Sequence, residues 1–315
     1  MPRIVQYQLP NIDLLLDRQS RPNYKVNPYH PELQTEFISF LDKIDHAISP
    51  FQRKAASDVS NAQAGQFDLD DMINLLNTCS DNEPFDTSKQ EDPLVHLAAK
   101  FARKCFPPLS ALYRYDATQG TILYLQAAAQ ENHDRMNTST FTVDSYLAHR
   151  RKVVAIHPVI AFNRWMSQVK LSPEILQTPA FEGLLESTID LIALPNDLIS
   201  YKKEKSQGED IHNLVSVAMV DPAIPVKSGD IQAALDFAGV KISEAYLRFQ
   251  QCKLDAIAQT APGDSETRSE IMRYVDILLK TIDGNIVWQI DPRTVRYQVF
   301  ETPEERAQWL VSICI

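Results

Sequence analysis

Most of the chain from residue 93 onward carries apolar side chains at helical spacing. Short segments marked by proline or aspartate interrupt these stretches, as expected where helices end. No segment shows a convincing strand pattern. The pattern predicts helices over residues 94–104, 107–131, 142–168 with a break near Pro158, 180–204, 209–220, 228–258 and 266–290.

The first 92 residues are less regular. Residues 1–30 contain four prolines, which block regular helix, so an extended strap over the body of the protein is expected there. Residues 31–48 carry apolar side chains at helical spacing and predict a helix. Residues 50–92 combine a polar run, the short helix-like string FDLDDMINLL and an acidic, loop-like string.

The predicted helices are unequal in length and show no repeat at the periods of helical solenoids. A stacked-repeat scaffold is therefore disfavoured. We expect an all-α protein, a single-domain α-helical bundle over residues 31–300. The strap of residues 1–30 precedes this domain, and a tail of residues 301–315 follows it.

Composition excludes several classes of function. The formal net charge is −10, which argues against binding to nucleic acid or an anionic membrane. Only 8 glycines occur in 315 residues, so a glycine-rich phosphate loop is improbable. Four widely spaced cysteines indicate free thiols in a reducing compartment. No apolar stretch is long enough to span a membrane, and Asp13 and Asp17 interrupt any signal-like start, so we expect a cytoplasmic protein.

The most informative segment runs from Asn196 to Glu204, at the end of a predicted apolar helix. Asn196, Ser200 and Glu204 are spaced four residues apart, which places them within about 80° of one another around a helix. An amide oxygen, a hydroxyl and a carboxylate are hard ligands that suit Mg²⁺ when a substrate phosphate and waters complete the set. The alternative is a polar stripe that faces solvent.

This segment resembles the Asn-Asp-x-x-Ser-x-x-x-Glu magnesium motif of class I terpene cyclases. The string GEDIHNLV at residues 208–215 resembles the continuation of that motif in microbial and fungal sesquiterpene cyclases. The resemblance implies an α-helical bundle of the class I terpenoid synthase type around a central apolar cavity. It also assigns Lys203, inside the motif, to substrate binding.

A second segment, Tyr146 to Arg151, resembles the Tyr-x-x-x-Arg-Arg segment of the family, whose arginine senses the substrate diphosphate. A guanidinium stays charged and grips phosphate oxygens with two parallel donors. Counting back 46 residues from Asn196 selects Arg150, whereas counting from a helix break at residues 155–158 selects Arg151. Both arginines stay candidates, and a basic cluster on an exposed helix is the alternative.

Near the C-terminus, Arg296 and Tyr297 resemble the terminal Arg-Tyr pair of the family, which binds diphosphate. The alternative for such a short match is a pair of surface residues. Their order and distance behind the magnesium motif favour the functional interpretation.

The first metal motif of the family, Asp-Asp-x-x-Asp/Glu, has only an imperfect counterpart. Asp70, Asp71 and Asn74 offer Asp-Asp-x-x-Asn, but the polar string SDVSNAQAGQ stands where an apolar helix is expected. A second alignment places this segment on the preceding helix and leaves the aspartate-rich element deleted. Two interpretations of Asp70 and Asp71 therefore stay open: they bind metal, or they lie on an ordinary helix surface.

The resemblance implies a prenyl diphosphate substrate, with farnesyl diphosphate favoured, and three Mg²⁺ ions. The ions and arginines would neutralise the leaving diphosphate while an apolar pocket holds the carbocation. Aromatic faces stabilise such a cation, although aromatic residues on helices more often belong to the core. The candidates for the pocket lining are Phe67, Phe162, Trp165 and Trp288.

Three other interpretations stay open. A trans-prenyl-chain synthase is also all-α and magnesium-dependent, but it needs a second aspartate-rich motif where Asn196 to Glu204 stands. A non-catalytic descendant would bind diphosphate or a partner without turnover. A helical interaction scaffold would match the three motifs only by chance. Either a monomer or a homodimer is compatible with the sequence.

Overall fold

The computed structural model describes residues 4–10, 69–81, 93–107, 109–136, 140–290, 297 and 299–314. Helices dominate these residues, which confirms the all-α class. The chain divides into two compact units. The larger unit comprises residues 1–22, 140–154 and 169–315, and the smaller unit comprises residues 23–139 and 155–168. The predicted helix over residues 31–48 and most of the predicted strap lie outside the described residues.

The smaller unit contains four described helices: α3 (Leu69–Ser80), α4 (Pro93–Cys105), α5 (Ala111–Met136) and α7 (Ile156–Met166). Helix α3 packs on α4 and α5, and α5 packs along α7. Met72, Leu75 and Leu76 lie on the buried face of α3, at the helical spacing expected of an amphipathic helix. The helix-like string FDLDDMINLL therefore forms most of α3, as predicted.

Helices α5 and α7 approach each other closely at Gly120. A Cβ atom at this position would lie 2.8 Å from the backbone nitrogen of Pro158, so a larger residue would force the helices apart. The break predicted near Pro158 occurs at Val154 and Ala155. Pro158 lies in the first turn of α7, where the absent N–H breaks no helical hydrogen bond. Ala155 supplies the turn with a left-handed φ of 57°.

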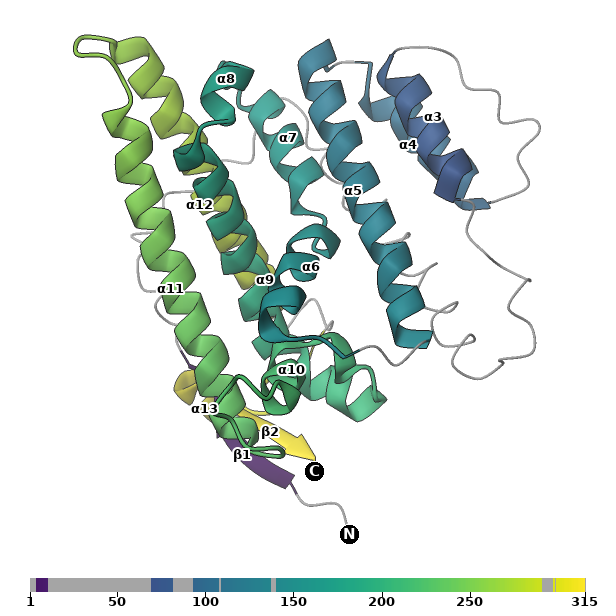
Figure 1. Cartoon of the computed structure of the whole chain (residues 1–315), viewed down its shortest axis with the longest axis vertical. Coiled ribbons are helices and arrows are strands. Elements are labelled where there is room, and N and C mark those ends of the chain that lie inside the picture. Colours follow the sequence, from purple (N-terminus) through teal and green to yellow (C-terminus); the bar gives the residue numbers. More distant parts are fainter. Residues whose placement is uncertain are drawn as a thin grey trace. The chain divides into compact units, whose positions relative to one another are not determined.

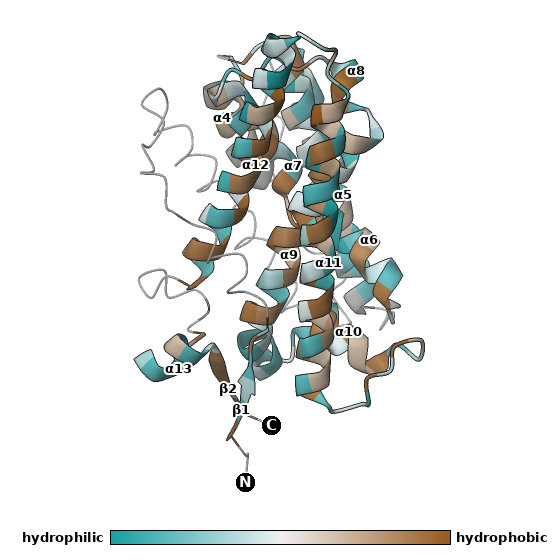
Figure 2. Cartoon of the chain, turned by 90° about the vertical axis from the view of Figure 1, so that its left-hand side faces the viewer, coloured by the Kyte–Doolittle hydropathy of each residue, from teal (hydrophilic) through white to brown (hydrophobic). Residues whose placement is uncertain are grey.

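Helix α9 (Pro179–Gln207) is the central element of the larger unit, with α11 (Ile231–Ala258) and α12 (Ser265–Ile290) running alongside it (Figure 1). Nearly every residue from Ser187 to Tyr201 is buried, as expected for a helix covered on all sides. Figure 2 shows apolar bands alternating with polar ones along α11 and α12, the pattern of helices that cover a core with one face. The other helices of this unit are α6 (Val143–Val153), α8 (Pro173–Leu176), η2 (Asp210–His212), α10 (Leu214–Val220) and α13 (Pro303–Gln308).

A two-stranded antiparallel ribbon joins the ends of the chain. Strand β1 (Ile4–Gln8) pairs with β2 (Leu310–Cys314), with Ile4 opposite Cys314 and Gln8 opposite Leu310. The expectation of no strand is therefore wrong. Each strand has five residues, and its partner lies at the other end of the sequence, so neither segment carries a local hairpin signal.

Two smaller expectations concern thiols and membrane spans. Cys79, Cys105 and Cys252 are free cysteines, as predicted for these three. Among the described residues, no helix combines the length and the apolar character needed to cross a membrane.

Candidate metal and diphosphate site

The residues of the predicted magnesium stripe lie on the C-terminal half of α9. Ser200 is fully buried, while Asn196 and Glu204 are partly buried. The solvent-facing alternative for this stripe is therefore wrong for Ser200. Its hydroxyl oxygen is buried and accepts or donates no hydrogen bond of normal geometry among the described residues. This hydroxyl lies between an amide and a carboxylate on one helix face, a set of oxygen donors of the kind that hard cations take.

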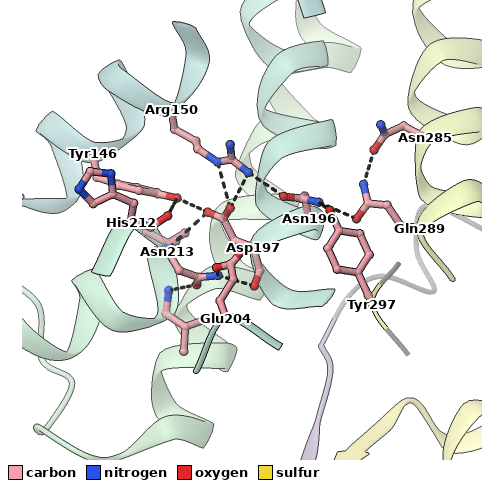
Figure 3. Close-up of polar contacts among 12 residues, drawn as sticks. Tyr146, Arg150, Asn196, Asp197, Glu204, His212, Asn213, Asn285, Gln289 and Tyr297 are labelled. Carbon is pink, nitrogen blue, oxygen red and sulfur yellow. Dashed lines mark hydrogen bonds and ion pairs between the residues drawn. The ribbon is translucent and has the colours of Figure 1, made fainter. Parts of the chain in front are cut away.

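Asn196 is the point at which the three predicted motifs meet (Figure 3). Its Oδ1 accepts a hydrogen bond of 2.7 Å from Nη2 of Arg150, which lies on α6. Its Nδ2 donates to the hydroxyl of Tyr297 at 2.9 Å and to Oε1 of Gln289 at 3.2 Å. Arg150 and Tyr297 are 46 and 101 positions from Asn196 in the sequence, and both contact its side-chain amide. Gln289, on α12, had no sequence signal that singled it out.

Arg150 and Arg151 occupy different surroundings. Arg150 contacts Asn196 and Asp197. Arg151 makes a two-pronged ion pair with Asp190, with both hydrogen bonds at 2.8 Å, and lies 3.3 Å from Glu186. The structure therefore brings Arg150, but not Arg151, to the predicted metal stripe.

Asp197 is a buried residue of the site that the sequence argument did not single out. Its carboxylate accepts hydrogen bonds from the Tyr146 hydroxyl at 2.6 Å and from Nε of Arg150 at 3.0 Å. Burial raises the pKa of Asp197, and the neighbouring Arg150 and the Tyr146 hydrogen bond oppose that rise. Burial and the Asp197 charge raise the pKa of Tyr146 well above its ordinary value, so this hydroxyl stays a donor. The sequence signal that could have identified Asp197 is its position as the aspartate of the Asn-Asp motif.

Asn213 is the second residue that sequence reasoning missed. It caps the N-terminus of α10, where its Oδ1 accepts from the Val215 amide. Its Nδ2 donates to Oε2 of Glu204 at 2.9 Å. Burial raises the pKa of Glu204, while this hydrogen bond and the nearby Ser200 hydroxyl lower it. The available signal was an asparagine directly before an apolar run, which is typical of a helix cap.

The C-terminal part of the site is carried by the segment after α12. Tyr297 is partly buried, and Nζ of Lys203 lies 5.7 Å from the centre of its ring, within cation–π range. The neighbouring Lys202 pairs with Glu301 at 2.6 Å, which ties the same segment to α9. Arg296 lies outside the described residues.

The other predicted residues lie in the smaller unit, on α12 or outside the described residues. Phe162 and Trp165 are buried in the core of the smaller unit, which agrees with the plain-core alternative. Trp288 lies on α12 and is 40% exposed. Asp70 and Asp71 occupy the first turn of α3 in the smaller unit, and metal ligation by them stays a prediction. Phe67 lies outside the described residues.

Comparison with known proteins identifies the class to which this fold and site belong. Residues 57–248 match the family model described as terpene synthase family 2, C-terminal metal binding. This match covers more than half of the chain, and the chain therefore belongs to the terpene synthase family. The matched residues include Arg150 and the whole of the Asn196 to Glu204 segment but end before Tyr297.

Individual relatives support the same assignment. Sesquiterpene synthase 1 of Postia placenta is 30% identical over 169 residues, which are 54% of this chain and 47% of that protein. A delta(6)-protoilludene synthase of Stereum hirsutum is 21% identical over 299 residues, or 84% of this chain and 78% of the relative. The chain spans about half the length of several curated relatives that it matches.

The fold is shared with solved structures of terpene synthases. Hedycaryol synthase, solved in complex with HEPES, superimposes with a TM-score of 0.62 at 16% sequence identity. The superposition covers 81% of this chain and 76% of that chain. The expected class I terpenoid synthase fold is thereby confirmed.

Proposed function

We propose that this chain is a magnesium-dependent class I terpene cyclase that ionises farnesyl diphosphate, cyclises the resulting carbocation to a sesquiterpene and releases diphosphate. The observation that carries the proposal is the meeting of Arg150 and Tyr297 on Asn196. Three segments with separate resemblances to diphosphate and metal motifs have no other evident reason to converge on one side chain. The similarity to sesquiterpene synthases of Postia placenta supports the substrate class.

The residues of the stripe fit a hard divalent cation. Asn196 Oδ1, the buried Ser200 hydroxyl and the Glu204 carboxylate supply three oxygen donors from one helix face. When bound, Mg²⁺ neutralises negative charge on the leaving diphosphate. In the proposal, three ions take part, and Asp70 and Asp71 are candidate ligands for the others.

Arg150 is the proposed diphosphate sensor. Its guanidinium is only 17% exposed and lies directly beside the stripe, where a planar, permanently charged group can grip phosphate oxygens. Arg151 forms ion pairs with Asp190 and Glu186, so it is less suitable than Arg150 as the diphosphate sensor. The Tyr297 hydroxyl, the Lys203 ammonium and Arg296 complete the proposed diphosphate contacts.

Carbocation chemistry also requires a pocket that is apolar and excludes water, because water would quench the cation. Phe67, Phe162, Trp165 and Trp288 stay candidates for its lining. A cytoplasmic location and a monomeric or homodimeric state stay predictions as well.

The test is direct incubation of purified protein with geranyl, farnesyl and geranylgeranyl diphosphate, with and without Mg²⁺. The organic extract is analysed by gas chromatography and mass spectrometry. The proposal predicts a magnesium-dependent sesquiterpene from farnesyl diphosphate. Absence of product from every substrate would contradict it.

A binding protein without turnover is the second candidate, since the polar string SDVSNAQAGQ precedes Asp70 where an apolar helix is expected. Absence of product would favour this candidate if inorganic diphosphate with Mg²⁺ still raised the melting temperature.

A further inference from the structure

The carboxylate of Asp197 gathers hydrogen-bond donors from two other segments of the larger unit. Its Oδ1 accepts from Nε and Nη2 of Arg150 on α6, at 3.0 and 2.9 Å. Its Oδ2 accepts from the Tyr146 hydroxyl at 2.6 Å and from the Leu214 amide, at the start of α10, at 3.3 Å. The residue is 1% exposed. A buried carboxylate satisfied by four donor atoms fixes the position of each group that donates to it.

One of these contacts leads to the first residue of the metal stripe. Nη2 of Arg150 donates to Asn196 Oδ1 at 2.7 Å while the same guanidinium is held by Asp197. Because guanidinium donors are fixed in one plane, the position of the carboxylate determines where Nη2 points. Asp197 therefore orients the amide of Asn196 through Arg150.

A second route leads to the last residue of the stripe. The Nδ2 group of Asn213 donates both to the backbone carbonyl of Asp197, at 2.8 Å, and to Oε2 of Glu204, at 2.9 Å. The residue after Asn213 donates its amide to the Asp197 side chain. The carboxylate of Glu204 is thus oriented by a segment that is itself docked on Asp197 (Figure 3).

We infer that Asp197 is a positioning residue that orients both ends of the metal stripe, Asn196 through Arg150 and Glu204 through Asn213. The inference rests on the proposed function. Asp197 lies about 100° around α9 from Asn196, at the edge of the stripe, and its carboxylate is occupied by the donors named above, so it contacts neither metal nor substrate in this account. Outer groups of this kind orient the ligands of metal sites and strongly affect metal affinity.

The chain offers a matched control on the same helix. Asp190 is also buried, at 5% exposure, and is also paired with arginines, Arg151 and Arg248. It lies seven residues from Asp197, roughly 10 Å along the helix axis, and its carboxylate accepts hydrogen bonds from Arg151 and Arg248 rather than from the stripe. Asp190→Asn and Asp197→Asn each remove one buried charge and keep the side-chain shape.

The experiment measures the binding of inorganic diphosphate to the full chain in the presence of Mg²⁺ by isothermal titration calorimetry, together with melting temperatures. An asparagine at position 197 presents an amide NH₂ to groups that are themselves donors. We expect Asp197→Asn to weaken diphosphate binding at least about tenfold. Asp190→Asn should keep its affinity within about threefold of wild type while the melting temperature falls.

Equal affinity of Asp197→Asn and wild type for diphosphate would overturn the inference but leave the proposed function standing. Equal losses of diphosphate affinity in Asp197→Asn and Asp190→Asn would have the same consequence. No binding by wild type would overturn the proposed function and the inference together.

If Asp197→Asn does not fold, a second variant tests the positioning role of Asp197. Asn213→Ser keeps a residue that caps α10 well but removes the amide that bridges Asp197 and Glu204. We expect several-fold weaker diphosphate binding, with a fall in melting temperature no larger than that of Asp190→Asn. Unchanged affinity in this variant would overturn the inference.

Discussion

Two arginine–aspartate clusters lie along α9, and they differ in the groups that their arginines contact besides the aspartate. At one, Arg150 pairs with Asp197 and also contacts Asn196, the first residue of the metal stripe. At the other, Arg151 and Arg248 both pair with Asp190, and Glu186 completes a neutral set of two cations and two anions. The arginines of the second cluster contact carboxylates alone, whereas the arginine of the first cluster also contacts an amide of the proposed metal stripe.

The difference teaches that adjacent, chemically identical side chains can serve separate purposes on one helix. Successive residues of α6 point about 100° apart, so Arg150 and Arg151 meet different parts of α9. In the proposed function the first cluster serves ligand binding, while the second links α6 and α11 to α9 through Asp190. The predictions below test this division of roles.

The largest effect is expected for the stripe itself. Asn196→Ala and Glu204→Ala remove proposed metal ligands and should lower turnover of farnesyl diphosphate by more than about 100-fold with little loss of fold. Glu186→Ala is the control, because Glu186 is a half-exposed carboxylate of the second cluster on the same helix. Retained turnover in both stripe variants, measured by gas chromatography, would contradict the metal assignment.

The next largest effect separates the two arginines. Arg150→Lys keeps the charge but loses the planar pair of donors that reaches both Asn196 and Asp197. We expect kcat/KM to fall roughly 10- to 100-fold in Arg150→Lys and less than about fivefold in Arg151→Lys. The reverse order in steady-state kinetics would make Arg151 the sensor.

The second cluster should affect stability more than turnover. Asp190→Ala leaves Arg151 and Arg248 without their shared carboxylate, although both guanidinium groups keep access to solvent. Partial exposure limits the cost, so we expect a loss of about 1–3 kcal/mol in the free energy of unfolding. Urea unfolding followed by circular dichroism measures this loss, and an unchanged midpoint would show that the cluster does not hold the helices together.

The smallest effect is expected at the C-terminal segment. Tyr297→Phe removes the hydroxyl that accepts a hydrogen bond from Asn196, but it keeps the ring near Lys203. Loss of one such hydrogen bond costs about 1 kcal/mol, or roughly a fivefold rise in KM. A wild-type KM would show that this hydroxyl does not support the site.

Sequence periodicity predicted most of the helices because their apolar faces are long and regular, as on α11 and α12. It missed the ribbon of β1 and β2, whose pairing joins opposite ends of the chain and leaves no local signal. The pattern of residues 142–168 indicated a break near Pro158, and the break at Val154 and Ala155 lies just before it, because a proline in the first turn of a helix is tolerated.

The placement of Asn196, Ser200 and Glu204 on one face of α9 was predictable, because the motif spaces them four residues apart, and metal ligation by them stays a prediction. The sequence could not decide between Arg150 and Arg151. Adjacent residues of a helix differ in the direction in which their side chains point, and that direction depends on how the helix packs. The roles of Asp197 and Asn213 depend on contacts between α9, α6 and α10, which no spacing along one helix reveals.

The measurement that tests the central claim most directly is electron paramagnetic resonance of Mn²⁺ added with inorganic diphosphate to wild type and to Asn196→Ala. Mn²⁺ takes the same hard oxygen ligands as Mg²⁺ and is visible by this method. The account predicts diphosphate-dependent Mn²⁺ binding by wild type that is weakened at least about tenfold in the variant. Equal binding by the two proteins would contradict the claim that the Asn196 to Glu204 face of α9 holds the metal.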